Sequence, residues 1–206
     1  MKFINLIMQL GNSDQKKVYA GWLILVVGNS GSGKDSIMKG VKEKFPSELK
    51  KLCLTQRFIT RPPSDTEDNF AVTPEDFKKM SLQGRFALEW NIYGLDYGVP
   101  IEIDDWMRKG HLVLVNVSRS IVKKARDIYQ NILVVFIEVP FEITLKRIKE
   151  RAREREEKLE ERIQRAKKNQ SFPEADFIVD NSGDLEDAIN KFLSYLLTTI
   201  KASGNY

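Results

Sequence analysis

The sequence predicts an α/β fold whose core is a parallel sheet between two layers of helices. Apolar runs at 23–27, 112–117 and 132–139 are rich in Val, Ile and Leu, which is typical of strands buried on both faces. Helix-like segments follow these runs, so strands and helices alternate along the chain. The first run also ends in a glycine-rich turn that opens a helix. These three observations together predict a three-layer core.

The glycine-rich turn, residues 28–36, reads GNSGSGKDS and contains the pattern G-x-x-x-x-G-K between a strand and a helix. Glycines let the backbone turn tightly and approach an anion without a Cβ in the way. Backbone N–H groups and the helix N-terminus then face the phosphates of a nucleotide, and Lys34 reaches the β- and γ-phosphates. This predicts a phosphate-binding loop (P-loop) and a core of the P-loop NTPase type. The predicted ATP-binding residues are Gly28, Asn29, Ser30, Gly31, Ser32, Gly33, Lys34, Asp35 and Ser36.

One position of this loop departs from the usual pattern. The Ser or Thr that normally follows the lysine and binds magnesium is Asp35, with Ser36 behind it. A carboxylate binds Mg²⁺ directly or through water. We therefore expect Mg²⁺ as a cofactor, with Asp35 as the candidate ligand.

The elements expected in the first half of the chain have clear boundary signals. Pro46 stops the helix that Lys34 opens. Thr73 is a predicted N-cap with Pro74 just inside the helix, and this helix ends near Gly84. The expected elements are a helix at 34–45, strands at 53–59 and 70–72, a helix at 74–84 and a strand at 85–93.

The second half continues the alternation of strands and helices. Gly110 ends one helix, Ser118 caps the next, and Pro140 begins a long helical region. The expected elements are helices at 101–109 and 119–129, a helical region at 140–170, a strand at 177–179 and a helix at 185–200, with the apolar strands 112–117 and 132–139 between them.

Three segments are expected to lie outside the core of this single domain of 206 residues. Residues 57–100 are rich in strands without crossover helices, which predicts a small inserted lobe where a phosphate-accepting substrate would lie. Residues 146–168 form a charged helical region. Residues 1–20 precede the first core strand, and the alternatives for them are an edge strand, a contact in a homodimer, or a disordered segment.

Charge and composition disfavour several functional classes. The net charge is +4, and residues 146–168 alone hold eleven Lys/Arg against six Asp/Glu. The acidic residues are interleaved and no aromatic residues accompany them, which favours a solvated helix over a nucleic-acid partner. No apolar run is long enough to span a membrane, and no secretory signal is predicted.

The single cysteine, Cys53, excludes an internal disulfide and fits a reducing compartment, so we expect a cytoplasmic protein. Cys53 is expected to be a buried small residue rather than a nucleophile, because the one histidine, His111, is distant in sequence. His111 is expected at the surface.

Six segments occur along the chain in the order GNSGSGKDS, RFITRP, EDNFAV, GRFALEWNIYGLDYGVP, VLVNVSRS and DFIVDNSGDL. In this order they resemble the guanylate-kinase-like branch of the P-loop kinases over residues 20–200, and within it the ribose 1,5-bisphosphate phosphokinases. The resemblance implies an enzyme that transfers the γ-phosphoryl group of ATP to ribose 1,5-bisphosphate. The products would be 5-phosphoribosyl 1-diphosphate (PRPP) and ADP.

The resemblance also implies roles for individual residues. The acceptor would be bound by Arg57, Arg61 and Tyr97. Asn116 and Arg119 are further candidates because they flank the C-terminal end of a core strand, where open α/β sheets bind ligands. The alternative for Arg119 is that it begins its helix in solvent. The region 146–168 would be a lid whose arginines, together with Lys34, neutralise the transferring phosphoryl group; these are Arg147, Arg151 and Arg162. Glu67 and Asp68 would position sugar hydroxyls or the metal, and a plain acidic loop is the alternative.

Several positions differ from GMP kinases. The second arginine of that family falls at Ser64, its phosphate-binding tyrosine at Asn69, and its two aspartates within residues 115–118, which hold no carboxylate. Its guanine-reading glutamate falls at Leu88 or Glu89, and that position stays open. A pocket without acceptors for the base N–H groups discriminates poorly in favour of guanine.

Three rival functions remain at this point. The first is a GMP or other nucleoside monophosphate kinase. The second is a catalytically inactive binding module of the same fold, which the intact P-loop disfavours. The third is a nucleic-acid-binding protein, whose mark would be a steep salt dependence of affinity.

Overall fold

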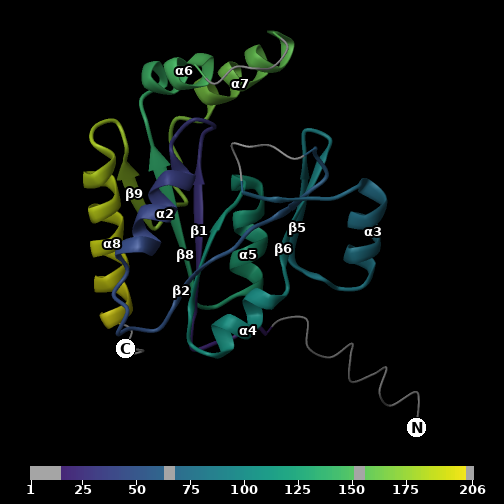
Figure 1. Cartoon of the computed structure of the whole chain (residues 1–206), viewed down its shortest axis with the longest axis vertical. Helices are drawn as coiled ribbons and strands as arrows, with labels where there is room; N and C mark the ends of the chain where they lie inside the picture. Colours follow the sequence, from purple (N-terminus) through teal and green to yellow (C-terminus); the bar gives the residue numbers. More distant parts are fainter. Residues whose placement is uncertain (1–14, 63–67, 151–155, 203–206) are drawn as a thin grey trace.

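The computed structural model describes residues 15–62, 68–150 and 156–202 (Figure 1). Its core is a five-stranded sheet in which every neighbouring pair of strands is parallel. The strand order is β2 (Leu52–Leu54), β7 (Leu112–Asn116), β1 (Trp22–Gly28), β8 (Ile132–Glu138) and β9 (Phe177–Asp180). The predicted parallel α/β core is confirmed.

Alternate residues of β1 face two different helical layers. Ile24 and Val26 pack in one cluster with side chains of α2 (Lys34–Lys44) and α8 (Leu185–Ala202). Leu23 and Leu25 pack in the other cluster with α4 (Glu102–Arg108) and α5 (Val122–Ile128). Since the strand is buried on both faces, its run of apolar residues is continuous, as the sequence predicts.

A second, four-stranded sheet lies beside the core (Figure 1). Its strand order is β4 (Phe70–Ala71), β3 (Phe58–Ile59), β6 (Leu95–Pro100) and β5 (Phe86–Ile92), and α3 (Pro74–Leu82) packs on it. The Phe77 ring of α3 stacks on Phe86 at 4.5 Å between centroids, and Phe58 lies 5.7 Å from Phe86. The Thr73 hydroxyl accepts a hydrogen bond from the Asp76 N–H at 3.1 Å, so the predicted N-cap is present.

Two predicted elements are wrong in their extent. Residues 53–59 are not one strand, because β2 belongs to the core sheet and β3 to the second sheet. The residues between them carry the chain from one sheet to the other: the Thr55 N–H still bonds to a core strand, whereas the Arg57 carbonyl bonds to Phe70. The helix expected at 119–129 begins with a 3-10 turn, Arg119–Ile121, and only then becomes α5.

The basic region forms two helices above the end of the core sheet (Figure 1). These are α6 (Phe141–Glu150) and α7 (Glu156–Lys168), where one helical region was predicted over 140–170. Residues 151–155, which include the predicted lid residue Arg151, lie outside the described part of the chain. Among the described residues, no helix is long and apolar enough to cross a membrane.

The end of the predicted N-terminal extension packs onto the core. Lys17 pairs with Tyr129 in an isolated parallel bridge, and its ammonium lies 2.6 Å from a carboxylate oxygen of Asp104. Asp104 is buried and also accepts hydrogen bonds from the hydroxyls of Tyr129 at 2.7 Å and Tyr19 at 3.2 Å. Residues 15–20 therefore have a fixed place in the fold, while residues 1–14 are outside the described ranges.

Candidate active site

The P-loop connects β1 to α2 and requires its glycines. Gly31 and Gly33 have φ angles of +81° and +85°, in the left-handed region that glycine adopts without a Cβ penalty. A Cβ on Gly33 would lie only 2.4 Å from Nδ2 of Asn181. A Cβ on Gly28 would lie 2.8 Å from both the carbonyl oxygen of Ile137 and Oγ of Ser32. The loop is therefore packed too closely for larger residues at these positions.

Lys34 begins α2 and lies across the mouth of this loop. Its ammonium donates to the carbonyl oxygens of Gly28 at 3.0 Å and Asn29 at 2.8 Å. Both carbonyls belong to the turn that would surround a bound phosphate, so the charge of Lys34 lies where the sequence predicts it.

Asn181 supports the P-loop from behind, and the sequence analysis missed it. It follows β9 directly, its side chain is buried, and Nδ2 donates to the Ser32 carbonyl at 2.8 Å. The signal that could have found it is its place just beyond the carboxyl end of a core strand, the edge at which α/β sheets bind ligands.

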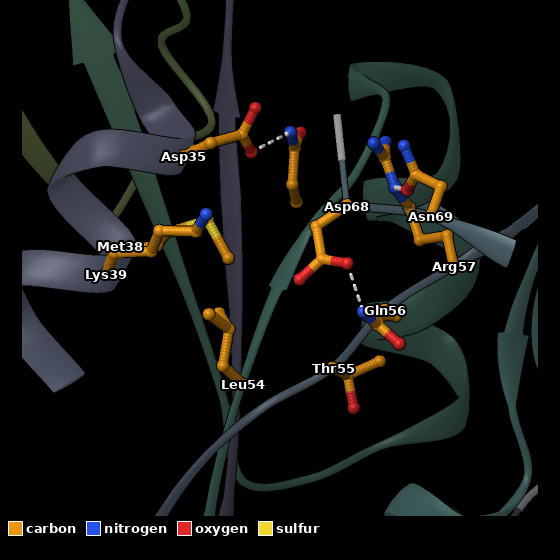
Figure 2. Close-up of a pocket in the computed structure, with 10 residues that line it drawn as sticks. Asp35, Met38, Lys39, Leu54, Thr55, Gln56, Arg57, Asp68 and Asn69 are labelled. Atoms are coloured by element: carbon orange, nitrogen blue, oxygen red, sulfur yellow. Dashed lines mark hydrogen bonds between the residues drawn. The ribbon is translucent and has the colours of Figure 1, made fainter. Parts of the chain in front are cut away.

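A pocket lies between α2 and the second sheet, next to the P-loop helix (Figure 2). Most of its lining residues are polar, and they combine cationic, amide and carboxylate groups. The lining residues are Asp35, Met38, Lys39, Leu54, Thr55, Gln56, Arg57, Asp68, Asn69 and Asn116. Such a pocket offers both cationic donors for phosphate oxygens and neutral partners for hydroxyl groups.

Arg57 is held at this pocket by residues of the second sheet. Its Nε donates to Oδ1 of Asn69 at 3.2 Å, as drawn in Figure 2, and its guanidinium lies 5.7 Å from the Tyr97 ring centroid. Trp90 stacks on Tyr97 from the neighbouring strand, with the rings 4° from parallel. Arg57 and Tyr97, two predicted acceptor residues, therefore lie together. Arg61, a third, is half-buried just beyond β3.

Carboxylates and amides pair across the same pocket. Asn116, at the end of β7, donates from Nδ2 to Oδ1 of Asp35 at 3.0 Å. Gln56 donates to the Asp68 carboxylate, and Figure 2 shows this pair beside Arg57. Asp68 therefore lies at the predicted site, whereas Glu67 and Ser64 lie outside the described residues.

Asp35 is the residue whose chemistry fits a magnesium ion. It is exposed on the first turn of α2, and Ser36 behind it is exposed as well. The described residues contain no group of three or more His, Cys, Asp and Glu that could hold a metal. Mg²⁺ at phosphate-transfer sites is commonly bound by one or two carboxylates together with substrate phosphates, so a single aspartate suffices.

Two of the predicted lid arginines contact the P-loop region. Nη2 of Arg162, on α7, donates to the Ser30 hydroxyl at 2.8 Å. Nη2 of Arg147, on α6, donates to the Asn181 carbonyl at 3.2 Å. Both guanidinium groups therefore lie beside the P-loop or the residue that supports it.

Arg119 makes contacts other than those expected of an acceptor-binding residue. Its guanidinium donates to the carbonyls of Asn169 at 2.6 Å and Ser171 at 2.8 Å. It also lies over the rings of Phe136 and Phe172, 4.8 and 5.4 Å from their centroids. Burial lowers the pKa of this guanidinium. These contacts anchor the segment that follows α7.

Leu88 and Glu89 are the two positions that could correspond to the guanine-binding glutamate of GMP kinases, and neither places a carboxylate beside Tyr97. Leu88 shares a face of the second sheet with Trp90, but it is buried in the core cluster and is apolar. Glu89 is the next residue, and alternation along the strand directs it to the opposite face.

Cys53 and His111 do not line the pocket beside the P-loop. Cys53 is half-buried on β2, and burial raises the pKa of its thiol, which fits the expectation that it is not a nucleophile. His111 precedes β7 and is half-buried rather than fully at the surface; burial and nearby lysines lower its pKa.

Comparison with known proteins decides the family. The family model described as guanylate kinase matches residues 21–199. The chain belongs to the guanylate kinase family. A crystal structure of guanylate kinase from Anaplasma phagocytophilum superposes with a TM-score of 0.61 at 17% identity, covering 88% of this chain and 87% of the other. This likeness supports the guanylate kinase fold.

Curated relatives place the chain in one branch of the guanylate kinase family. The ribose 1,5-bisphosphate phosphokinase PhnN of Rhodopseudomonas palustris is 37% identical over 169 residues, covering 82% of this chain and 84% of the relative. The protein of the same name from Pectobacterium atrosepticum is 38% identical over 177 residues, covering 84% and 93%. The chain therefore belongs with the ribose 1,5-bisphosphate phosphokinases, as its motifs predict.

Proposed function

We propose that this protein transfers the γ-phosphoryl group of ATP to the 1-phosphate of ribose 1,5-bisphosphate and forms PRPP and ADP. The observation that carries the proposal is the pocket of Figure 2. It presents Arg57, Gln56 and Asp68 to an acceptor, whereas the strand positions open for guanine recognition hold a buried leucine and a glutamate on the other face. Membership of the phosphokinase branch supports the same acceptor.

The donor side of the reaction belongs to the P-loop. Its backbone N–H groups and Lys34 would bind the ATP phosphates, and Arg162 and Arg147 would neutralise charge on the transferring group from the lid side. Mg²⁺, bound by Asp35 with the phosphate oxygens, would supply further neutralisation of negative charge. Arg151 is proposed as a third lid residue.

The acceptor side belongs to the second sheet. Arg57, Arg61 and Tyr97 would bind the acceptor phosphates, because a guanidinium pairs with two phosphate oxygens at once. Asp68 and Gln56 would contact ribose hydroxyls, since a carboxylate accepts and an amide both donates and accepts hydrogen bonds. Asn116 would hold Asp35 in place. Arg119 would influence the site indirectly, by holding the segment that follows α7 through its hydrogen bond to the Asn169 carbonyl.

The reaction needs no general base. An oxygen of the acceptor 1-phosphate is already anionic and attacks the γ-phosphorus of ATP. The new P–O bond forms as the bond to the β,γ-bridging oxygen breaks, and ADP leaves with that oxygen. The protein therefore contributes positioning of the substrates and neutralisation of charge rather than proton transfer. This fits the sequence of β7, which ends at Asn116 and contains no carboxylate.

The direct test is product identification. The purified full chain is incubated with ATP, Mg²⁺ and ribose 1,5-bisphosphate, and the products are identified by mass and by phosphorus NMR. The expected product carries a diphosphate on C1 of ribose, and it forms about 10²–10³-fold more slowly with Lys34→Met. The proposal would be overturned by a product phosphorylated at another position. It would also be overturned if ribose 1,5-bisphosphate gave no product while GMP was converted efficiently to GDP.

A further inference from the structure

The turn between β5 and β6 has an unusual residue at its tip. Tyr93 and Gly94 form a two-residue hairpin turn, with φ angles of +57° and +73°. Such turns favour Asn-Gly, because both positions require a left-handed backbone. Tyr93 is the one non-glycine residue with a positive φ in the described part of the chain. A bulky residue in this conformation is strained, and such strain persists where it serves a function.

The contact that Tyr93 makes is with the lid. The guanidinium carbon of Arg165, on α7, lies 3.5 Å from the Tyr93 ring centroid. Tyr93 is otherwise 59% exposed, so this stacking is not a by-product of burial in the core. Arg165 is also oriented by Glu161, one helical turn earlier, at 2.7 Å. A guanidinium over an aromatic face is an attractive pairing.

The same helix contacts the P-loop on the donor side. Arg162, three residues before Arg165, donates to the Ser30 hydroxyl, and residues three apart lie on one face of a helix. Asn169, one turn after Arg165, accepts from Nδ2 of Asn29 at 2.8 Å. Tyr93, Arg162, Arg165 and Asn169 line one shared cavity with the P-loop. α7 thus joins the donor loop to the tip of the second sheet.

We infer that Tyr93 and Arg165 are positioning residues that hold α7 against the second sheet, so that binding of the acceptor and binding of ATP favour one another. The inference rests on the proposed function, because it assigns the second sheet to the acceptor. The strained turn places the ring where Arg165 meets it, and that contact places Arg162 at the P-loop. This positioning role requires no contact of either residue with the reacting atoms.

The test uses Tyr93→Asn, with Tyr93→Phe as the matched control. Asparagine suits the left-handed turn but removes the ring, whereas phenylalanine keeps both the ring and the strain. Tyr93→Asn should raise Tm, because asparagine relieves the strain of the turn. It should also make trypsin cleavage within α7 about 2–5-fold faster, because the cation–π contact with Arg165 is lost and such a contact at an exposed site is worth about that factor. Tyr93→Phe should match the wild type in both. Wild-type cleavage of α7 in Tyr93→Asn would overturn the inference.

A second measurement reads the coupling itself. Affinity for a non-hydrolysable ATP analogue is measured with and without ribose 1,5-bisphosphate. In the wild type, ribose 1,5-bisphosphate should increase the affinity for the ATP analogue. Tyr93→Asn and Arg165→Gln should each reduce this increase by about 2–5-fold. The double variant should show the same reduction as either single variant, because the two residues act through one contact. Glu161→Gln, which breaks the ion pair alone, should retain most of it. Additive losses would contradict the inference.

The two proposals fail in different ways. If the wild type does not phosphorylate ribose 1,5-bisphosphate, the proposed function fails, while the trypsin measurement, which needs no acceptor, still decides whether Tyr93 holds α7. If the wild type is active and Tyr93→Asn shows wild-type coupling and cleavage, the positioning role fails and the proposed function stands.

Discussion

Lys34 makes the first prediction at the scale of a single residue. Its ammonium is held by two carbonyls of the P-loop, Gly28 and Asn29, so its charge is fixed at the phosphate site. Lys34→Met should lower kcat by about 10²–10³-fold, the usual effect of losing one preorganised charge-stabilising donor. Lys42→Met, an exposed lysine on the same helix, is the control and should retain wild-type turnover in a coupled ADP-release assay.

Two glycines with similar backbones make a second residue-scale prediction. Gly33 and Gly84 both have left-handed φ angles, +85° and +67°, but nothing lies within 4 Å of a Cβ at Gly84. Gly84→Ala should cost only the conformational strain, about 1–2 kcal/mol. Gly33→Ala should cost about 1–3 kcal/mol more, because its Cβ displaces Asn181 from the buried Ser32 carbonyl.

Urea unfolding of the two variants checks this prediction. Equal losses in the free energy of unfolding would show that Asn181 does not support the loop. ATP affinity adds a second readout, since only Gly33→Ala should weaken it.

Individual residues also show which parts of the site the sequence could predict. The P-loop motif predicts Lys34 and its glycines because the pattern is local and its chemistry is stringent. Asn181 could not be found in this way, since its partner Ser32 is 149 residues earlier in the chain. Arg119 stays a predicted acceptor residue only because it follows the C-terminal end of a core strand; its contacts with Asn169 and Ser171 depend on how distant segments pack.

At the scale of elements, the second sheet carries the prediction for acceptor binding. Arg57 precedes β3 and is oriented by Asn69 and Tyr97 at the pocket. Arg57→Met should lower kcat/KM for ribose 1,5-bisphosphate by about 10–100-fold, the loss expected for one charge-assisted hydrogen bond to phosphate. The KM for ATP should change little. Steady-state kinetics with each substrate varied in turn measures both effects.

The matched control for Arg57 lies beside the same sheet. Arg85 is exposed and pairs with Glu102 at 3.4 Å. Arg85→Met should leave kcat/KM for both substrates unchanged. Equal losses in Arg57→Met and Arg85→Met would show that the effect comes from net charge, and would contradict a specific role for Arg57.

Element boundaries show why sequence patterns succeed in some places and fail in others. The strands β1, β7 and β8 are continuous apolar runs because both of their faces are buried, so the pattern alone predicts them. The segment 53–59 was predicted as one strand, yet it supplies strands to two sheets. Its partners are far away in sequence, on β7 and β6, and local propensity carries no information about them.

At the scale of the whole molecule, the buried cluster around Asp104 predicts a pH dependence of stability. Burial and the hydrogen bond to Asp104 raise the pKa of Tyr129 well above its ordinary value of 10. In the unfolded chain this tyrosine loses its proton near pH 10, while the folded protein retains it. Stability should therefore be undiminished below pH 10 and fall above it, by up to about 1.4 kcal/mol per pH unit.

Tyr129→Phe tests the origin of this dependence. The variant should be less stable at pH 8, because it loses the bond to Asp104, but its stability should fall less steeply between pH 10 and 11. Tyr93→Phe, which removes an exposed hydroxyl, should keep the wild-type slope. Chemical unfolding at each pH supplies the data, and an unchanged slope in Tyr129→Phe would assign the effect to other groups.

The overall architecture was largely predictable, because alternating buried strands and helices with a P-loop restrict the topology to few choices. The packing of residues 15–20 was left open, and the reason lies in Lys17. Its partner Asp104 is 87 residues later, and an isolated bridge to Tyr129 has no periodic signal in the sequence. The course of this segment is set by tertiary contacts alone.

We propose that the pocket beside the P-loop recognises a sugar phosphate rather than a purine, because among the described residues neither Leu88 nor Glu89 directs a carboxylate towards Tyr97. The ratio of kcat/KM for ribose 1,5-bisphosphate to that for GMP, measured on the wild type at saturating ATP and Mg²⁺, tests it most directly. We expect a ratio of at least about 10³, because a guanine base would leave polar groups without partners. A ratio near or below one would contradict it and identify a nucleotide kinase.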